Sequence, residues 1–437
     1  MLNNKLHQAS TYFLFLIPIV FVIGIAVTET LVLLITFYFF YKNKNLEFYK
    51  NRIIIFLIFF SIYVALNGYL QIGDNLKYSS IFHIRYVFLS IAVFFLLESN
   101  QKFLSSINNK FIKFIIIFLF FIFFDSFFQF LHGKNIFGFE IYQGRITGIF
   151  DNEPILGSFL IKLLPLVMLI LTLNNFDFKG KSIFLYFFLG LYFLTIYLAA
   201  GRVSFFLLLF FNFFIILMIR NLRKIYLISL VVMIFFVITF SFLKIGKSDP
   251  FDRIFVKSFN QITNHLFFEL SPNYYKNKEN LDLKKEMIDN IKVYSDHHQG
   301  HYIVAYELFK KNPFFGAGPK GFRFYCRKVD YAPPYPNAVC STHPHNIVVQ
   351  ILSETGLVGF FFYFLGVFFI ILNIFKLSKK RVNPVNKNCF LLISGALVMN
   401  LFPFLPSGNF FNNWMSIINY YYIGFYLYYF KKIFKNK

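Results

Sequence analysis

Long apolar runs separated by short polar segments fill most of the chain of 437 residues. A helix that crosses a bilayer needs about 20 mostly apolar residues, and twelve runs approach that length. The predicted spans are residues 12–27, 30–41, 53–71, 81–97, 114–131, 154–173, 183–200, 203–219, 225–243, 347–375, 390–405 and 414–430. Glu29 favours a turn between the first two runs, although residues 12–41 could instead form one long tilted helix. The pattern predicts an all-α, polytopic integral membrane protein.

One long polar segment separates the ninth predicted span from the tenth. Within it, residues 302–311 are predicted to form an amphipathic helix, which Asn312-Pro313 would end. The chain therefore divides into an N-terminal membrane bundle (residues 1–243), a large loop (244–344) and C-terminal membrane helices (345–437).

Composition and charge agree with this class of protein. The residues are 57% hydrophobic and only 14% charged, which argues against a soluble enzyme. The net charge of +23 would suggest a nucleic-acid partner in a soluble chain. Here the basic residues lie between apolar runs and form no single patch, so they are better explained by the excess of Lys and Arg in cytoplasmic loops. This distribution places both termini in the cytoplasm and the large loop outside, and it leaves the bilayer, not a nucleic acid, as a partner.

Two arginines lie in short loops that this topology places outside. Arg202 occupies a tight turn after Ala200-Gly201, and its planar fork suits paired phosphate oxygens. The alternative is an interfacial anchor that reaches lipid phosphate. Arg145 precedes Glu153 and Pro154 at the entrance of the sixth span, where a solvated loop charge is an equally good explanation.

Two further basic residues, Lys162 and Arg85, fall inside apolar runs. An ionisable residue within a membrane span is by default a functional candidate, but either residue could instead pair with a buried carboxylate or carbonyl.

The strongest cluster of polar residues, Ser341 to Asn346, opens the tenth span. Asn346, Gln350 and Ser353 share one helix face, which must meet protein or a water-filled cavity. His345 is predicted to lie in the first helical turn, where the helix dipole disfavours imidazolium. A neutral imidazole there can act as a general base, and the alternative is a hydrogen-bonded capping histidine.

Cys326 and Cys340, with thirteen residues between them, could form a disulfide beside His345 or remain two thiols. The imidazoles of the large loop could form a metal site, but no carboxylate stands at a diagnostic spacing, so no metal or cofactor is predicted. The histidines concerned are His297, His298, His301 and His343. No phosphate-binding loop of the GxxxxGK type is present, which argues against ATP hydrolysis.

At this point the motifs resemble a known family. His345-Asn346, nine further residues and then Gly356-x-x-Gly359 resemble the hallmark of the bacterial O-antigen ligase and polymerase superfamily. Residues 312–322 are similar to its Pro-x-x-Gly-x-Gly segment, and residues 145–159 are similar to its segment before the sixth span. Arg202 matches the arginine of its short external turn, so the resemblance covers most of the chain from Arg145 to Gly359.

The resemblance implies a metal-independent glycosyltransferase that takes a glycan from undecaprenyl diphosphate at the periplasmic face of the bacterial inner membrane. A ligase passes the glycan to a sugar hydroxyl of lipid A–core, whereas a polymerase passes it to a lipid-linked repeat unit. His345-Asn346 with its downstream glycines favours the ligase, and the polymerase is the alternative. The resemblance makes His345 the catalytic residue that activates the acceptor hydroxyl, while arginines hold the diphosphate. The predicted substrate-binding set is Arg202, Arg145, Lys162, Glu153, Asn346, Gln350 and Arg323.

One feature of the family has no match here, because relatives often place an arginine near the start of the amphipathic helix. Arg323 or Arg327 could replace it. A flippase or other transporter of lipid-linked oligosaccharides is a further alternative, but the repeat-related halves of transporters are not visible in this sequence.

Overall fold

The computed structural model describes residues 2–43, 46–73, 75–101, 109–173, 182–260, 296–326, 340–378 and 380–435. These residues are helical, with no strand among them. Each predicted span overlaps a helix, although the bounds differ. The helices are α1 (Leu2–Val20), α2 (Ile25–Lys42), α3 (Arg52–Gln71), α4 (Ile84–Ser99), α6 (Asn109–His132), α7 (Leu156–Leu173), α8 (Ser182–Leu198), α9 (Arg202–Met218), α10 (Arg220–Phe242), α15 (Ile347–Ser378), α16 (Pro384–Asn400) and α17 (Asn413–Phe430).

Seven helices in the described part of the chain are long and apolar enough to cross a membrane, and three shorter helices are also apolar. The prediction of a polytopic all-α membrane protein is therefore confirmed. The number of twelve spans and the side of the membrane on which the large loop lies stay predictions.

The first apolar stretch contains two helices, but the turn between them was predicted at the wrong place. The chain breaks at residues 21–24, where Gly24 has a φ of 141° that favours glycine. Glu29 lies inside α2, and its Oε1 is 2.9 Å from Nη2 of Arg85. The Tyr86 hydroxyl donates to the same carboxylate at 2.8 Å. Glu29 is thus tolerated inside a helix because the ion pair neutralises it. The prediction that Arg85 could pair with a carboxylate is confirmed.

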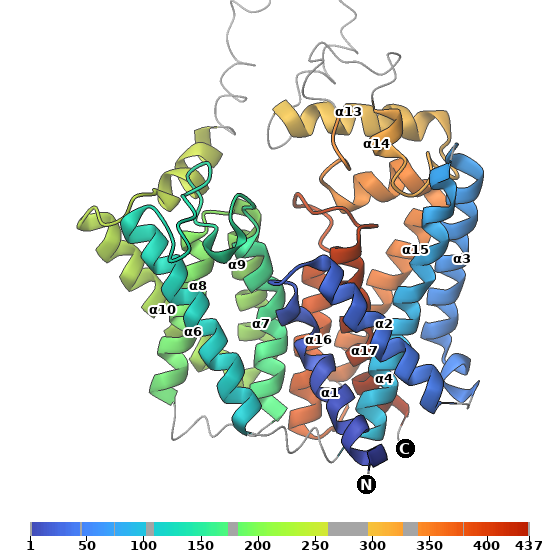
Figure 1. Ribbon diagram of the computed structural model, residues 1–437, viewed down its shortest axis with the longest axis horizontal. Helices are drawn as coiled ribbons and strands as arrows, with labels where there is room; N and C mark the ends of the chain where they lie inside the picture. The colour runs from blue at the N-terminus through green and yellow to red at the C-terminus, as the bar shows by residue number, and fades with distance from the viewer. Residues whose placement is uncertain are drawn as a thin grey trace, which may run out of the picture.

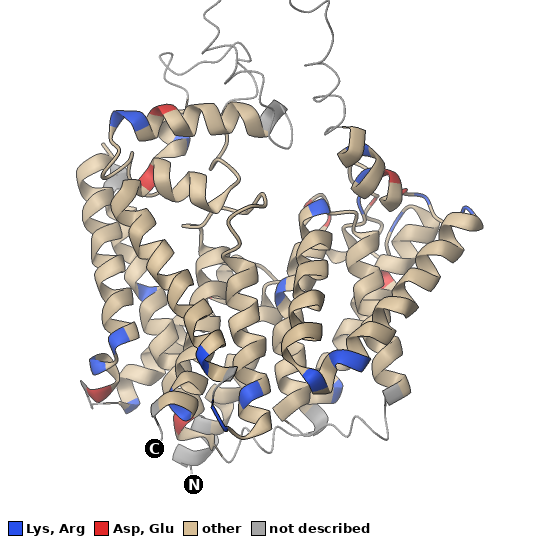
Figure 2. Cartoon of the chain, turned by 180° about the vertical axis from the view of Figure 1, so that it is seen from behind, with Lys and Arg blue, Asp and Glu red and all other residues tan. Residues whose placement is uncertain are grey.

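The helices form two groups that lie side by side in Figure 1, one of α6 to α10 and one of α1 to α4 with α15 to α17. Packing of α16 against α7 and α9 joins the groups. Helix α13 (Asp296–Lys311) crosses one end of the bundle, hereafter the α13 end, and both termini lie at the opposite, terminal end. Figure 2 shows several lysines and arginines gathered at the terminal end.

Helix α13 is longer than the predicted residues 302–311, because it begins at Asp296. It packs on α15 and on the short helix α14 (Phe322–Tyr325). One apolar cluster, which includes Val304, Leu308 and Phe322, fixes it there. The helix therefore forms a roof over the polar start of α15.

The glycine motifs of the sequence form the joint between this roof and α15. Gly356 interrupts α15 with φ 62° and ψ −165°, a conformation that only glycine adopts readily. At the kink, backbone N–H and C=O groups of α15 lose their partners within the helix, and the preceding loop forms hydrogen bonds with them. Leu357 N donates to Pro313 O at 2.8 Å, and Ala317 N donates to Ser353 O at 2.9 Å. The loop and the helix are thus joined backbone to backbone.

Candidate functional site

Three arginines from separate segments come together at the α13 end of the α6–α10 group. Arg202 is the first residue of α9, and its Nε donates to Arg253 O at 3.0 Å. Arg253 lies in the short helix η4 (Asp252–Val256), and its Nη1 donates to Gln143 O at 3.0 Å, two residues from Arg145. We call Arg145, Arg202 and Arg253 the arginine cluster.

The loop that carries Arg145 is fixed by a buried amide of α6. Gln129 Oε1 accepts hydrogen bonds from Thr147 N at 2.9 Å and from Gly148 N at 2.8 Å. Its Nε2 donates to Phe139 O at 3.1 Å. Because a buried amide with these bonds has one low-energy orientation, the loop is held in place before any ligand arrives.

The arginines of the cluster repel one another. Burial, then the charges of Arg253 and Arg202, lower the pKa of Arg145 to about 10. Burial and Arg202 also lower the pKa of Arg253. Within the described residues, neither Arg145 nor Arg253 forms an ion pair, and the buried Nε of each lacks a hydrogen-bond partner. An anion with several oxygens would satisfy these donors and offset the repulsion.

The second part of the site is the segment that precedes α15. His345 does not lie in the first turn of that helix, as predicted, but two residues before it, with a left-handed φ of 58°. Asn346 is the residue that caps the helix, since its Oδ1 accepts from Val349 N at 3.1 Å. Burial lowers the pKa of His345 from its usual value.

Other imidazoles surround His345. Ring centroids lie at 4.1 Å for His343, 5.2 Å for His301 and 5.7 Å for His298. His343 Nε2 lies 3.0 Å from the carbonyl oxygen of Ser407, which can only accept, so this nitrogen carries the proton. Burial and the neighbouring imidazole lower the pKa of His343 to about 3.

These histidines do not form a metal centre in the structure. No group of three or more His, Cys, Asp or Glu side chains in the described part of the chain is arranged to hold a metal ion. The side chain of His297 lies outside that part. Metal independence therefore stays a prediction.

The loop between α16 and α17, residues 401–412, holds the histidine segment from the other side. Ser407 N donates to His345 O at 2.8 Å, and Asn346 Nδ2 donates to Pro403 O at 2.8 Å. Gln350 Oε1 accepts from Phe410 N at 2.9 Å. These contacts give Asn346 and Gln350 a positioning role, and substrate binding by them stays a prediction.

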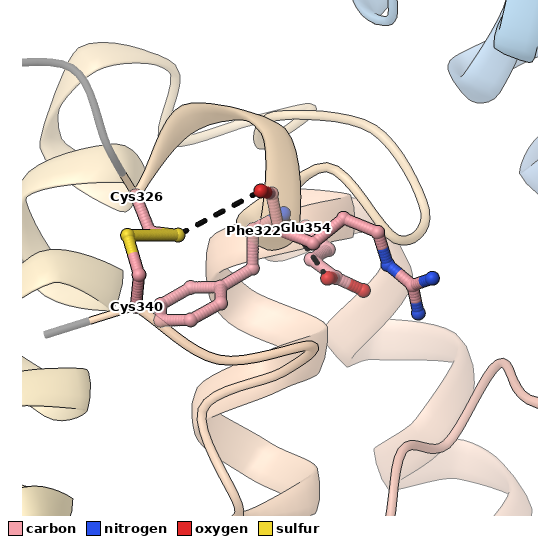
Figure 3. Close-up of a disulfide and its surroundings, with 5 residues drawn as sticks. Phe322, Cys326, Cys340 and Glu354 are labelled. Carbon is pink, nitrogen blue, oxygen red and sulfur yellow. Dashed lines mark hydrogen bonds between the residues drawn. A yellow bond between two sulfur atoms is a disulfide. The ribbon is translucent and has the colours of Figure 1, made fainter.

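A buried carboxylate and a disulfide complete the support (Figure 3). Glu354 accepts hydrogen bonds from Lys320 N at 2.9 Å and Phe322 N at 3.2 Å, and it accepts a third from Gln350 Nε2 at 2.9 Å. Cys326 and Cys340 form a disulfide with their Cα atoms 5.3 Å apart. The roof and the histidine segment are therefore tied together covalently as well as by hydrogen bonds.

Two of the remaining predicted residues, Lys162 and Glu153, take part in none of these contacts, whereas Arg323 acts electrostatically on His343 and Glu354. Lys162 Nζ is 2.8 Å from Met415 Sδ and forms no ion pair with a described carboxylate. Glu153 is exposed just before α7. Arg323 lies on α14, and its buried Nε has no hydrogen-bond partner among the described residues. Arg327 lies outside the described residues.

Two basic residues of the site escaped the sequence reasoning. Arg253 stands at the start of the long loop, where the positive-inside bias carries little information. Lys320 follows the glycine motif, close to Arg323 in the sequence, and the fold brings it near Arg85.

Fold and site together define a multi-pass membrane protein with an arginine cluster and a supported histidine at one end. Residues 185–364 match the family model described as O-antigen ligase. The matched region contains Arg202, Arg253 and the His345–Gly359 motif, and it confirms the resemblance to the O-antigen ligase and polymerase superfamily. No curated protein matches the chain.

Proposed function

We propose that this protein transfers a glycan from undecaprenyl diphosphate to a sugar hydroxyl, with the α13 end facing the periplasm of the bacterial inner membrane. The observation that carries the proposal is the arginine cluster, in which the buried Nε groups of Arg145 and Arg253 have no hydrogen-bond partner among the described residues. A diphosphate with several oxygens is suited to such a cluster. Both termini then lie in the cytoplasm, in agreement with the basic residues at the terminal end.

The chemistry assigns one role to each part of the site. The acceptor oxygen attacks the anomeric carbon of the donor, and the bond from that carbon to the diphosphate oxygen breaks. The electron pair leaves with undecaprenyl diphosphate, where the arginine cluster stabilises the developing charge. His345, kept neutral by burial, takes the proton of the acceptor hydroxyl. Relatives often place a further arginine near the start of the amphipathic helix, and the sequence offered Arg323 or Arg327 as its replacement. In this proposal Arg253 takes that role and makes the second contact to the diphosphate.

Substitution of the base tests this role. In nanodiscs, His345→Ala should slow glycan transfer by at least about 100-fold, the usual contribution of a general base. His132→Ala is the matched control, because His132 is an exposed histidine at the end of α6. Equal thermal stability of both variants would show that the loss is chemical, and normal product from His345→Ala would overturn the proposal.

The acceptor separates three versions of the function, and a deletion strain distinguishes them. A ligase transfers to lipid A–core, so its loss leaves bare core while long lipid-linked polymer accumulates. A polymerase transfers to a lipid-linked repeat unit, so its loss leaves core that carries a single repeat. Bare core with single lipid-linked repeats trapped in the cytoplasmic leaflet would instead indicate a flippase.

A further inference from the structure

Ser341 is a polar residue of the histidine segment to which the proposed chemistry assigns no role. Its hydroxyl oxygen lies 3.1 Å from Nε2 of His345. Within the described residues this is the only hydrogen bond of the His345 ring, and no carboxylate there forms an ion pair with it. A histidine that acts as a base is usually oriented by a third group, which bonds the ring nitrogen that faces away from the substrate. In the described structure, Ser341 stands at that position.

The imidazoles around His345 do not take this place. His343 is the nearest, but both of its nitrogens are already bonded: Nε2 donates to a backbone carbonyl oxygen at 3.0 Å, so Nδ1 accepts from the Thr342 hydroxyl at 2.9 Å. His298 and His301, both on α13, meet the ring of His345 at centroid distances of 5.7 Å and 5.2 Å. These are ring contacts and not hydrogen bonds to His345, so they do not fix which of its nitrogens carries the proton.

The bond to Ser341 gives the two ring nitrogens of His345 different roles. A neutral imidazole has one N–H donor and one nitrogen lone pair. If the Ser341 hydroxyl donated to Nε2, that lone pair would be occupied, and His345 could not take a proton from an acceptor hydroxyl. A base at this position therefore carries its own proton on Nε2, donates it to Ser341 Oγ, and keeps the lone pair on Nδ1. The bond becomes stronger when the ring gains a second proton, because its donor is then charged.

The disulfide fixes the place of Ser341 in space (Figure 3). Cys340 directly precedes Ser341, and it is bonded to Cys326, which follows the short helix α14. Cys326 is 5% exposed and packs in the apolar cluster of the roof. On the other side of Ser341, the Thr342 carbonyl oxygen accepts from Asn409 Nδ2 at 3.3 Å. The roof and the α16–α17 loop thus hold both neighbours of Ser341, and its hydroxyl with them.

We infer that Ser341, held by the Cys326–Cys340 disulfide, is a positioning residue that accepts a hydrogen bond from Nε2 of His345 and makes Nδ1 the atom that takes the acceptor proton. This inference rests on the proposed function and adds to it the group that orients the base. In the transfer, the acceptor O–H bond breaks, its proton forms a bond to Nδ1, and its electron pair stays on the attacking oxygen. Ser341 keeps its own proton throughout.

Removal of the hydroxyl tests the inference. Ser341→Ala should lower kcat by about tenfold or more with little change in the KM values, because the lost bond is strongest when the ring is charged. Ser341→Thr keeps a hydroxyl and should retain most of the activity. Thr342→Val is the matched control, because it removes the neighbouring hydroxyl, which bonds His343 and not His345, and should leave kcat nearly unchanged. An unchanged kcat in Ser341→Ala, or an equal loss in Thr342→Val, would overturn the inference.

The pH dependence of kcat separates orientation of the base from a loss of folded protein. A hydrogen bond to the protonated ring raises the pKa of His345, so its removal lowers that pKa. The acidic limb of the profile should therefore lie about one pH unit lower in Ser341→Ala than in the wild type, the shift that corresponds to a tenfold weaker bond. The other titratable or charged groups around the segment are the same in both proteins, namely His298, His301, His343 and Arg323. A lower kcat with an unmoved limb would show that Ser341 is only structural.

A double-mutant cycle tests the link to the disulfide. Cys326→Ser releases Cys340 and should lower kcat because Ser341 is no longer held beside His345. Ser341→Ala should then add little to the loss in Cys326→Ser, since both changes remove the same hydrogen bond. Two losses that multiply would overturn the part of the inference that concerns the disulfide.

A measurement without turnover separates this inference from the proposed function. Nitrogen NMR of the full-length protein in nanodiscs, labelled with 15N-histidine, reports the tautomer, and the His345 signals are identified by their loss in His345→Ala. In the wild type the proton should lie on Nε2, and in Ser341→Ala both tautomers should be populated. A wild-type proton on Nδ1 would overturn the inference, whereas normal glycan transfer by His345→Ala would instead overturn the proposed function.

Discussion

Gly356→Ala should disconnect the roof from α15. The residue has φ 62° and ψ −165°, and a side chain in that region costs about 1–3 kcal/mol. A Cβ would also overlap the backbone of Phe314. Phe314 lies in the loop whose backbone forms hydrogen bonds with α15 on both sides of the kink. Since backbone cannot move aside as a flexible side chain can, the loop must shift away.

The cost follows from the bonds that this shift breaks. Three backbone hydrogen bonds join the loop to the kink, donated by Leu357 N, Val358 N and Ala317 N. At about 1 kcal/mol each they add about 3 kcal/mol to the strain, for a total of about 4–6 kcal/mol. We expect local detachment of residues 312–317 with the bundle intact, and loss of glycan transfer because Glu354 then loses its partners on the roof.

Thermal unfolding, limited proteolysis and transfer activity in nanodiscs measure the effect together. Gly366→Ala is the matched control on the same helix, because its Cβ would make only an ordinary contact of 3.8 Å. Gly366→Ala should resemble the wild type, whereas Gly356→Ala should be cleaved in the roof by the protease and should be inactive. A Gly356→Ala protein with wild-type stability and activity would refute this account of the kink.

Further substitutions probe the rest of the site. Arg253→Lys should weaken donor binding by about tenfold in a KM measurement, because a point charge replaces a planar fork. Cys326→Ser, compared with Cys389→Ser as a control for a buried free cysteine, should destabilise the roof by about 3 kcal/mol in thermal unfolding, as expected for a loop of this length. Gln350→Leu should lower activity with little change in the KM values, because Phe410 N loses its acceptor. The pKa of His343 is about 3 in the folded protein, below its unfolded value of 6.5, so its contribution to stability is complete above pH 6.5 and is lost as the pH falls from 6.5 toward 3. A melting temperature that falls over this range in the wild type and less in His343→Gln would bear this out.

The helices could be predicted because each apolar run is long and each interruption is polar. The misplaced turn before α2 shows the limit of that reasoning, because Glu29 breaks the pattern in sequence while Arg85 neutralises it in space. Arg202 could be found because a basic residue in a short turn that is predicted to lie outside is conspicuous. Arg253 could not, because the long loop that contains it follows no charge rule.

The environment of His345 could not be predicted from sequence for a different reason. Its neighbours His298 and His301 come from α13, and the backbone N–H that fixes its carbonyl comes from Ser407. These contacts depend on how the roof and the α16–α17 loop fold over α15, which local periodicity does not encode. The sequence pointed to the helix dipole as the reason for a neutral His345, whereas the structure adds burial, which lowers the pKa of His345.

The two parts of the site belong to different helix groups, so their spacing depends on how the groups pack. In a membrane, small residues let helix backbones approach closely. Gly395 of α16 is such a residue, because a Cβ there would press on Phe211 and Phe214 of α9. Beyond it, Phe402 of the α16–α17 loop packs on Phe210 of α9 with ring centroids 4.9 Å apart, and Ser407 of the same loop holds His345. One loop therefore connects the helix that begins with Arg202 to the proposed base. A change at this interface should alter the distance from leaving diphosphate to acceptor hydroxyl, and so the rate of transfer, without touching either substrate.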